Sequence, residues 1–285
     1  MTTKHYLLVT LVMFFLGSAY PLGKFGLNAS VSPLLFGSLR MGCVFLFLIP
    51  FCKIIIPKKK YILPLIGFSI CMGAGVNMFL YLSIDAVSLL APITIGAQLS
   101  IPFAILISSL FLKENVSLKK WVFIFLSFIG ILLIAFDPKI LDEIYGLLLV
   151  FAMAFFYGLS QVFSRSIKDL DVKFTNSFMG FVGFIILITF SHIFEGNIID
   201  QIKKIEFAGW LAVIYAGMII SIFGHMMMFY LYKFYPVGMV MPFYSLFPLF
   251  GLILTFFIFG EVPSLFTIIG GIIVITSIYL LQKTR

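Results

Sequence analysis

The chain has 285 residues, of which 62% are hydrophobic and only 11% are charged. Soluble domains average about 45–50% apolar and about 25% charged residues, so this composition excludes an ordinary soluble protein and indicates an all-α integral membrane protein. The net charge of +8 comes from Lys and Arg residues in the polar links between apolar stretches, where membrane topology explains them better than a nucleic-acid-binding surface does.

Ten apolar stretches follow one another along the chain, and each is about the length that crosses a hydrocarbon core of roughly 30 Å. We expect the first to be a transmembrane helix and not a cleaved signal peptide, because further apolar stretches follow at once. The links are too short for a soluble domain, which predicts a single membrane unit. The predicted spans cover residues 5–23, 31–52, 61–84, 88–112, 120–136, 144–165, 174–194, 207–232, 236–259 and 264–282.

The basic residues predict which side of the membrane each link occupies, because cytoplasmic links carry the excess of Lys and Arg. With the N-terminus inside, most of the nineteen basic residues fall in cytoplasmic segments, including the turn "KENVSLKK" between the fourth and fifth spans. We therefore expect a multi-pass protein of the cell (inner) membrane with both termini in the cytoplasm. The outer segments then hold Lys24, Lys139, Lys203 and Lys204.

Two segments of the chain share one pattern. "AILISSLFLKENVSLKKW" and "GLILTFFIFGEVPSLFT" each contain an apolar helix and then a polar turn with Glu and Ser, and a second apolar helix follows. Aligning Glu114 with Glu261 divides the chain into two five-helix repeats, residues 1–137 and 141–285. Because five is odd, the second repeat is inverted in the membrane. Ten helices in two inverted repeats around a central site are a plan of secondary transporters.

Three stretches resemble the EamA family of the drug/metabolite transporter superfamily. They are "LGSAYPLGKFGLNASVSPLLFGSLRM" at 16–41, "APITIGAQLSIPFAILISSLFLKENVS" at 91–117 and "PVGMVMPFYSLFPLFGLILTFFIFGEVPS" at 236–264. The last two are similar to that family's proline-containing helix, acidic turn and helix. The first is similar to its opening helix, short outer loop and second helix with an intramembrane Arg.

Within that family, "GAQLSIPFAILISSLFLKE" most resembles the branch of O-acetylserine and cysteine exporters. The chain departs from the usual family pattern in lacking a Trp near Gly17 and in having Lys-Glu where Gly-Glu is common. The resemblance implies transport of a small metabolite, with amino acids or related compounds as the first class to consider.

Arg40 is the strongest single candidate for a substrate-binding residue. It lies well inside the second span, where a charge costs about 2.5–3.5 kcal/mol on insertion scales and must face a cavity or a partner. Its planar guanidinium would suit a carboxylate substrate. The alternative is a structural bond to carbonyls at a helix break, or a side chain that reaches the outer surface.

Uncharged polar side chains at membrane depth form the second group of candidates. The amides either bind substrate or hold helices together, and we expect at least one of them at the cavity. The tyrosines would give the cavity an apolar wall with hydroxyl groups. The amide candidates are Asn77, Gln98 and Gln161, and the tyrosine candidates are Tyr20, Tyr81, Tyr157 and Tyr244.

His225 is the histidine predicted deepest in a span, so it is either a proton relay or a hydrogen-bonded packing residue. Pro21 and Gly23 are expected to end or bend the first span, and Lys24 beside them either guards the outer mouth or is an ordinary interfacial lysine. The carboxylates at the turns, Asp85, Glu114 and Glu261, are interpreted as caps or loop contacts. The predicted hinge prolines are Pro92, Pro102, Pro242 and Pro248, because proline removes a backbone hydrogen bond and bends a helix.

The three cysteines lack metal-ligand spacing and are interpreted as free apolar thiols, so no metal or other cofactor is expected. The expected partners are a small-molecule substrate and the lipid bilayer but no nucleic acid, and the expected assembly is a monomer or a weak homodimer. No phosphate-binding loop motif is present, which favours secondary transport.

The sequence thus predicts a transporter that exports small metabolites by alternating access, with the substrate between the two repeats near Arg40, Gln98, Gln161 and Tyr244. Uptake or exchange of a nucleotide-like or other metabolite is the alternative. A membrane enzyme is the distant alternative, because the spans lack paired acids, a His-Glu zinc motif and a nucleophile with its base.

Overall fold

The computed structural model describes residues 2–52, 56–111, 116–224, 227, 231, 234–235 and 241–284, and every regular element in these ranges is helical. Nine helices within them are long and apolar enough to cross a membrane, and they match nine of the ten predicted spans. The ninth predicted span appears as a shorter apolar helix, Phe243–Phe259, and residues 236–240 lie outside the described ranges. The nine long helices are Thr3–Asn28, Pro33–Phe51, Lys59–Asp85, Leu90–Phe111, Leu118–Ala135, Leu141–Ser166, Val172–Phe194, Phe207–Gly224 and Leu265–Lys283.

Several spans are built from more than one element. The first half of the chain contains α1 (Thr3–Gly17), α2 (Ala19–Asn28), α3 (Pro33–Leu48), η1 (Ile49–Phe51), α4 (Lys59–Phe68), η2 (Ser69–Gly75), α5 (Val76–Asp85), α6 (Leu90–Gly96), η3 (Ala97–Leu99), α7 (Ser100–Phe111) and α8 (Leu118–Ala135). The second half contains η4 (Leu141–Glu143), α9 (Ile144–Ser166), α10 (Val172–Phe194), α11 (Ile198–Lys204), α12 (Phe207–Tyr215), η5 (Ala216–Gly224), η6 (Met241–Leu246), α15 (Phe247–Phe259) and α16 (Leu265–Lys283).

Segments of π-helix and 3₁₀-helix occur in corresponding spans of the two halves of the chain. The third span changes to a π-helix over η2, and the eighth does so over η5. The fourth span contains the 3₁₀ turn η3, and the 3₁₀ segment η6 precedes α15. A π-helix in a long helix is rare and often marks a functional site. These turns therefore direct attention to the third, fourth, eighth and ninth spans.

Prolines explain where the 3₁₀ segments lie. Pro102 has no N–H to donate to the carbonyl four residues earlier, which is that of Gln98 in η3. Pro248 has the same relation to Tyr244 in η6. The first span breaks at Ser18, three residues before Pro21, and the helix then continues past Gly23 to Asn28. Of the two alternatives for Pro21 and Gly23, an end of the span is excluded because the helix continues past both residues.

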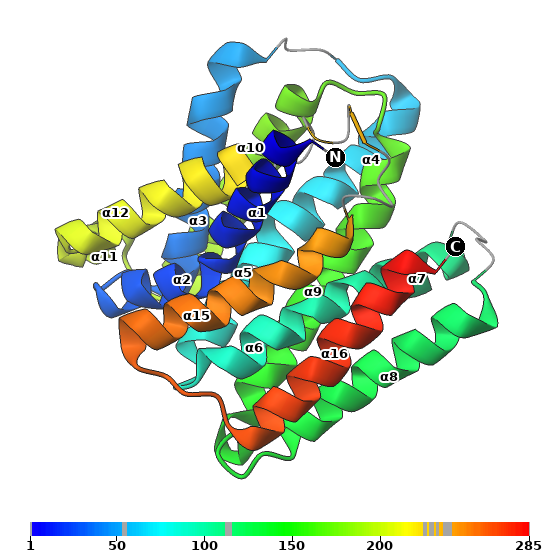
Figure 1. Ribbon diagram of the computed structural model, residues 1–285. Coiled ribbons are helices and arrows are strands. Elements are labelled where there is room, and N and C mark those ends of the chain that lie inside the picture. The colour runs from blue at the N-terminus through cyan, green and yellow to red at the C-terminus, as the bar shows by residue number, and fades with distance from the viewer. Residues whose placement is uncertain are drawn as a thin grey trace.

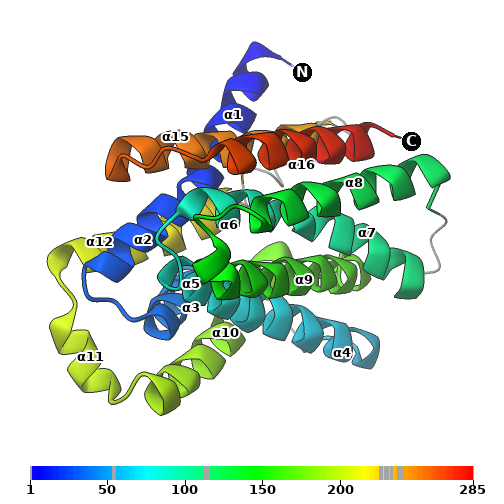
Figure 2. The same ribbon diagram turned by 90° about the horizontal axis from the view of Figure 1, so that it is seen from below.

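Two long antiparallel pairs lie side by side in the bundle, α8 with α16 and α3 with α10 (Figures 1 and 2). In the first pair the main chains approach closely at Gly130 and Gly270, where a Cβ on Gly130 would lie 2.8 Å from the Gly270 carbonyl oxygen. Small residues allow this close packing, on which helix association in lipid depends.

The remaining spans form two groups that mix the halves of the chain. The third and fourth spans pack against α9, whereas the first span packs against the eighth and against α15. The short helix α11 lies at one end of the bundle, and both chain termini lie toward the other end (Figure 1).

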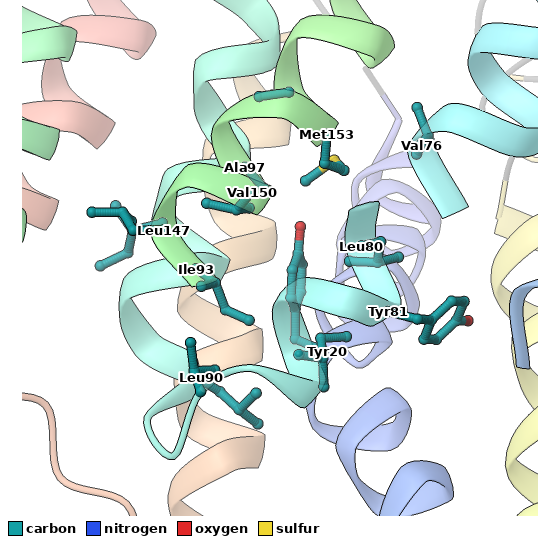
Figure 3. Packing of buried hydrophobic residues seen from close by; sticks show 14 of the residues in the cluster. Tyr20, Val76, Leu80, Tyr81, Leu90, Ile93, Ala97, Leu147, Val150 and Met153 are labelled. Atoms are coloured by element: carbon teal, nitrogen blue, oxygen red, sulfur yellow. The ribbon is translucent and has the colours of Figure 1, made fainter. Parts of the chain in front are cut away.

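A large apolar core lies between these groups and brings α2, α5, α6 and α9 together. Figure 3 shows Tyr20 of α2 standing between Leu80 of α5 and Ile93 of α6, with its hydroxyl directed toward Val150 and Met153 of α9. The core therefore places a polar hydroxyl where several spans meet.

Candidate functional site

Arg40 lies on α3 and joins the third span to the eighth. Its Nε donates a hydrogen bond to Ser221 Oγ in η5 at 2.9 Å, and its Nη1 donates to the Tyr81 hydroxyl on α5 at 3.2 Å. The Arg40 side chain is only 8% exposed, and Tyr81 is 1% exposed. Arg40 is therefore buried, and it does not extend to the surface as one interpretation of the sequence allowed.

The Arg40 guanidinium has five N–H donors, and two of them bind Ser221 and Tyr81. Among the described residues, no carboxylate lies within ion-pair distance of it, and both of its partners are neutral hydroxyl groups. A buried charge without a counter-ion is costly. The arrangement therefore leaves both charge and hydrogen-bonding capacity for an anionic group.

Two predicted tyrosines, Tyr20 and Tyr81, lie near this arginine. Tyr20 of α2 is within electrostatic range of both Arg40 and Tyr157 of α9, and Tyr81 contacts Arg40 directly. Tyr20 is buried and Tyr157 is partly buried. Of the predicted site residues, Arg40 and Tyr81 are therefore in direct contact, and Tyr20 lies close to them.

Asn77 lies at the start of α5, directly after the π-helix η2. Its Nδ2 donates to the carbonyl oxygens of Met72 and Gly73, both at 3.0 Å. The amide thus satisfies carbonyls of its own helix, and in this structure it does not bond to another helix as the packing interpretation supposed. Its Oδ1 is buried and has no hydrogen-bond partner among the residues that the structure describes.

Gln98 and Tyr244 contact each other across the fourth and ninth spans. Gln98 is fully buried, and its Nε2 donates to the main-chain carbonyl of Tyr244 at 3.1 Å. The expectation that an amide holds helices together is confirmed at Gln98. Its Oε1 is buried, and no donor for it lies within the described ranges. Gln98 therefore both joins two helices and carries a vacant acceptor.

Within the described ranges, the other predicted residues make no hydrogen bond to Arg40. Gln161 is half-buried on α9, and its main-chain carbonyl accepts a hydrogen bond from Ser164. Pro92 is buried in α6, Pro102 in α7 and Pro248 at the start of α15, and Pro242 lies in η6. His225 and Glu114 lie outside the described residues.

Lys24 anchors the end of the third span. Its Nζ donates to the carbonyl oxygens of Ile84 at 3.1 Å and Val87 at 2.7 Å. Lys24 also lines a pocket of about 340 Å³ together with Asn28, Ser88, Leu89, Leu90, Phe259 and Glu261. Lys24 is half-buried and already bonded within the protein, so its first role is to hold the link between α5 and α6.

Two carboxylates cap helices across the bundle. Glu261 accepts hydrogen bonds from the main-chain N–H groups of Leu90 at 2.8 Å and Ala91 at 2.9 Å, at the start of α6. Glu195 does the same for Leu34 at 2.7 Å and Leu35 at 3.1 Å, at the start of α3. The prediction that Glu261 is a cap is confirmed, whereas Asp85 is exposed at the end of α5.

Burial raises the pKa of the Glu261 carboxyl above its ordinary value of 4.5. The hydrogen bonds from Leu90 and Ala91 favour the carboxylate and offset part of this increase. We call the region around these caps the capped end of the bundle; it comprises the links at residues 29–32, 86–89, 195–197 and 260–264.

Sequence reasoning missed Ser221 and Glu195. Ser221 is a lone serine in an apolar run, and only the π-helix turns it toward Arg40. Glu195 directly follows α10 and could have been recognised by its similarity to the acidic turn at Glu261. Within the described ranges, no group of three His, Cys, Asp or Glu side chains is placed to hold a metal ion.

A sequence profile of the EamA-like transporter family matches residues 3–136 and, separately, residues 144–282. The chain belongs to the EamA-like transporter family. It is therefore a multi-pass membrane protein, and the family points to a transporter and away from an enzyme.

Two relatives from Bacillus subtilis (strain 168) are also named as transporters. The uncharacterized transporter YdfC is 26% identical over 190 residues, which cover 62% of this chain and 57% of YdfC. The uncharacterized transporter YoaV is 30% identical over 181 residues, which cover 60% of this chain and 61% of YoaV. The matched segments thus span less than two thirds of either relative.

The crystal structure of another protein has a similar fold. It is 14% identical in sequence, with a TM-score of 0.66 over the full length of both chains. At this identity the likeness concerns the fold alone.

Proposed function

We propose that this EamA protein is a secondary-active transporter that moves small carboxylate-bearing metabolites, most simply amino acids or related compounds, across the inner membrane. The observation that carries the substrate class is Arg40, a buried cation with two neutral partners and further N–H groups to donate. A guanidinium forms paired hydrogen bonds with a carboxylate, and the low dielectric around it strengthens them.

The side-chain amide oxygens of Asn77 and Gln98 support the proposal that the same substrate carries an amino group. Asn77 Oδ1 and Gln98 Oε1 are buried acceptors for which the described residues provide no donor. An unsatisfied buried acceptor costs about 1–3 kcal/mol, and an ammonium group would remove that cost. A carboxylate near Arg40 and an ammonium near one of these amides would together favour an amino acid over a simple acid.

The inverted-repeat architecture is part of the same proposal. The family profile matches the chain twice, over residues 3–136 and 144–282, which supports two repeats of five helices. The π-helices η2 and η5 and the 3₁₀ segments η3 and η6 recur in the corresponding spans, which supports the same division. Following the distribution of Lys and Arg, both termini are cytoplasmic and the capped end faces outward.

Alternating access follows from this architecture. In the present conformation, half-buried carboxylates of the second repeat hold the starts of two helices of the first, so the capped end is closed. Opening it requires Glu195 and Glu261 to leave these helices. The breaks associated with Pro102 and Pro248 let the fourth and ninth spans bend during the change.

Transport into proteoliposomes tests the proposal. Vesicles loaded with a panel of amino acids, O-acetylserine, cysteine and nucleotides would be assayed for counterflow, with and without a proton gradient. O-acetylserine and cysteine are included because the chain resembles the branch of O-acetylserine and cysteine exporters. Saturable counterflow of an amino acid supports the proposal, whereas counterflow of nucleotides alone contradicts the carboxylate assignment.

Arg40→Ala should abolish this counterflow at an unchanged protein level, and Arg165→Ala is the matched control. Arg165 is exposed in the last turn of α9, away from the buried site. If both variants transport like the wild type, Arg40 does not bind the substrate.

A further inference from the structure

The pocket that Lys24 and Glu261 line lies at the capped end of the bundle, and we call it the outer pocket. It is formed by α2, the link before α6 and the end of α15, so its walls come from both halves of the chain. These helices lie side by side (Figure 1). Its volume of about 340 Å³ is at the small end of the range of about 300–1,000 Å³ that ligand pockets span. The outer pocket therefore has room for a small metabolite.

Lys24 and Glu261 both keep hydrogen-bonding capacity in the outer pocket. An ammonium group has three N–H donors, and Lys24 uses two of them on the carbonyl oxygens of Ile84 and Val87. A carboxylate has about four lone-pair sites, and Glu261 uses two of them on the main-chain N–H groups at the start of α6. Among the described residues, one donor and about two acceptor sites thus remain for a ligand. The bonds to the main chain also hold both side chains in place.

The charges around the outer pocket define the class of ligand. Lys24 and Glu261 are close enough for their charges to interact, although each is bonded to main-chain groups and not to the other. Glu143 adds a second negative charge near Glu261, and it accepts a hydrogen bond from the Ser88 N–H at 2.9 Å. A ligand with one carboxylate and one ammonium group matches this arrangement. A phosphate-bearing anion would instead meet two carboxylates.

We propose that the outer pocket is a second binding site, which takes a zwitterionic amino acid. The ligand carboxylate accepts the third N–H of Lys24, and the ligand ammonium group donates to Glu261. An apolar ligand side chain lies against Leu89 and Phe259, which complete the lining on that side. The ligand class and the outward direction are those of the proposed transporter, so this assignment rests on the proposed function.

Occupancy of the outer pocket affects the opening of the capped end. Opening moves Glu261 away from α6, which separates two walls of the pocket. A ligand shifts an equilibrium toward the state that it binds more tightly. A bound amino acid therefore favours the closed state, and an amino acid that accumulates outside slows the opening of this end.

Protection of a cysteine from a polar thiol reagent measures occupancy of the outer pocket directly. The full-length protein is used in detergent, where both ends are accessible to the reagent, with Cys43, Cys52 and Cys71 replaced by Ser. The reporter is Asn28→Cys, because Asn28 lines the pocket and is exposed. The probe is L-leucine. Its analogues are isocaproate, which lacks the ammonium group, and isoamylamine, which lacks the carboxylate.

Leucine should slow the labelling of Asn28→Cys in a saturable way. Each analogue should need a concentration about fivefold higher for the same protection, which corresponds to the loss of one partly exposed ion pair. Lys24→Met and Glu261→Gln should each raise the leucine concentration for half-protection by the same factor. The matched controls are Lys203→Met and Asp200→Asn, which remove exposed charges of α11 outside the pocket lining and should leave that concentration unchanged.

Arg40→Ala separates the outer pocket from the central site. Leucine should protect Asn28→Cys equally well in this variant, whether or not the variant transports. No protection by leucine, equal protection by all three compounds, or protection that disappears in Arg40→Ala would overturn the proposal. The analogues test both charges without a substitution, so the result does not depend on how well Lys24→Met folds. Because labelling in detergent needs no transport, this failure is distinct from a failure of the counterflow assay.

Discussion

Glu261→Ala offers a sharp test of how the capped end is held closed. The substitution removes both acceptors from the N–H groups of Leu90 and Ala91 at the start of α6. A hydrogen bond to a charged group contributes about 1.5–3 kcal/mol. Glu261 is only half-buried, so water replaces part of the interaction, and we expect a total loss of about 2 kcal/mol.

For a chain of this size, 1 kcal/mol corresponds to about 2–4 °C in Tm, so Glu261→Ala should lower Tm by about 4–8 °C. The assay is thermal unfolding of the purified protein in detergent. Asp85→Ala is the matched control, because Asp85 is an exposed carboxylate at the end of the neighbouring helix α5. Equal Tm values for Glu261→Ala and Asp85→Ala would refute the capping role. The Tm of Glu261→Gln, which keeps one acceptor, should fall between those of Glu261→Ala and the wild type.

Three further predictions follow from the packing, the site and the cap. Gly17→Ala would place a Cβ 2.9 Å from the main-chain nitrogen of Gly251, so overpacking should lower the free energy of unfolding by about 1–3 kcal/mol. Gly224→Ala is the control, because a Cβ there has ordinary van der Waals space and should change Tm little. Similar Tm values for the two variants would contradict the close contact at Gly17. Tyr81→Phe removes one hydroxyl acceptor from Arg40 and should raise the counterflow KM severalfold; an unchanged KM would remove Tyr81 from the site. Burial raises the pKa of the Glu261 carboxyl, so the folded state binds a proton there at a higher pH than the unfolded state does. Acidification from about pH 7 to about pH 5 should therefore raise the Tm of the wild type relative to that of Glu261→Gln. A difference in Tm that does not change with pH would contradict this.

The spans could be predicted from the sequence because burial in lipid demands long apolar stretches, and nine of the ten appear as long helices in the described ranges. Arg40 could be singled out because an intramembrane charge is rare. Its partner Ser221 could not be, since a single serine in an apolar helix has no pattern of its own, and the π-helix that turns it toward α3 has no simple sequence signature.

The prolines identified which helices bend, but not what their free carbonyls would bind. The contact between Gln98 and the Tyr244 carbonyl depends on the packing of two distant spans, which local sequence does not determine. Asn77 was expected either to bind substrate or to join helices. It instead satisfies carbonyls of η2, because a π-helix displaces those carbonyls from their usual partners.

The most direct test of the proposed function compares an amino acid with its carboxamide analogue, which keeps the amino group but lacks the carboxylate. In counterflow with the wild type, the amino acid should be transported and the amide should compete at least tenfold more weakly. The amino acid keeps one charge-assisted hydrogen-bonded pair at Arg40, which contributes about 1.5–3 kcal/mol, and the amide loses it. In Arg40→Gln that preference should disappear, while Arg165→Gln should keep it. If Arg40→Gln still prefers the carboxylate as strongly as the wild type does, the buried arginine is a structural residue and the substrate binds elsewhere.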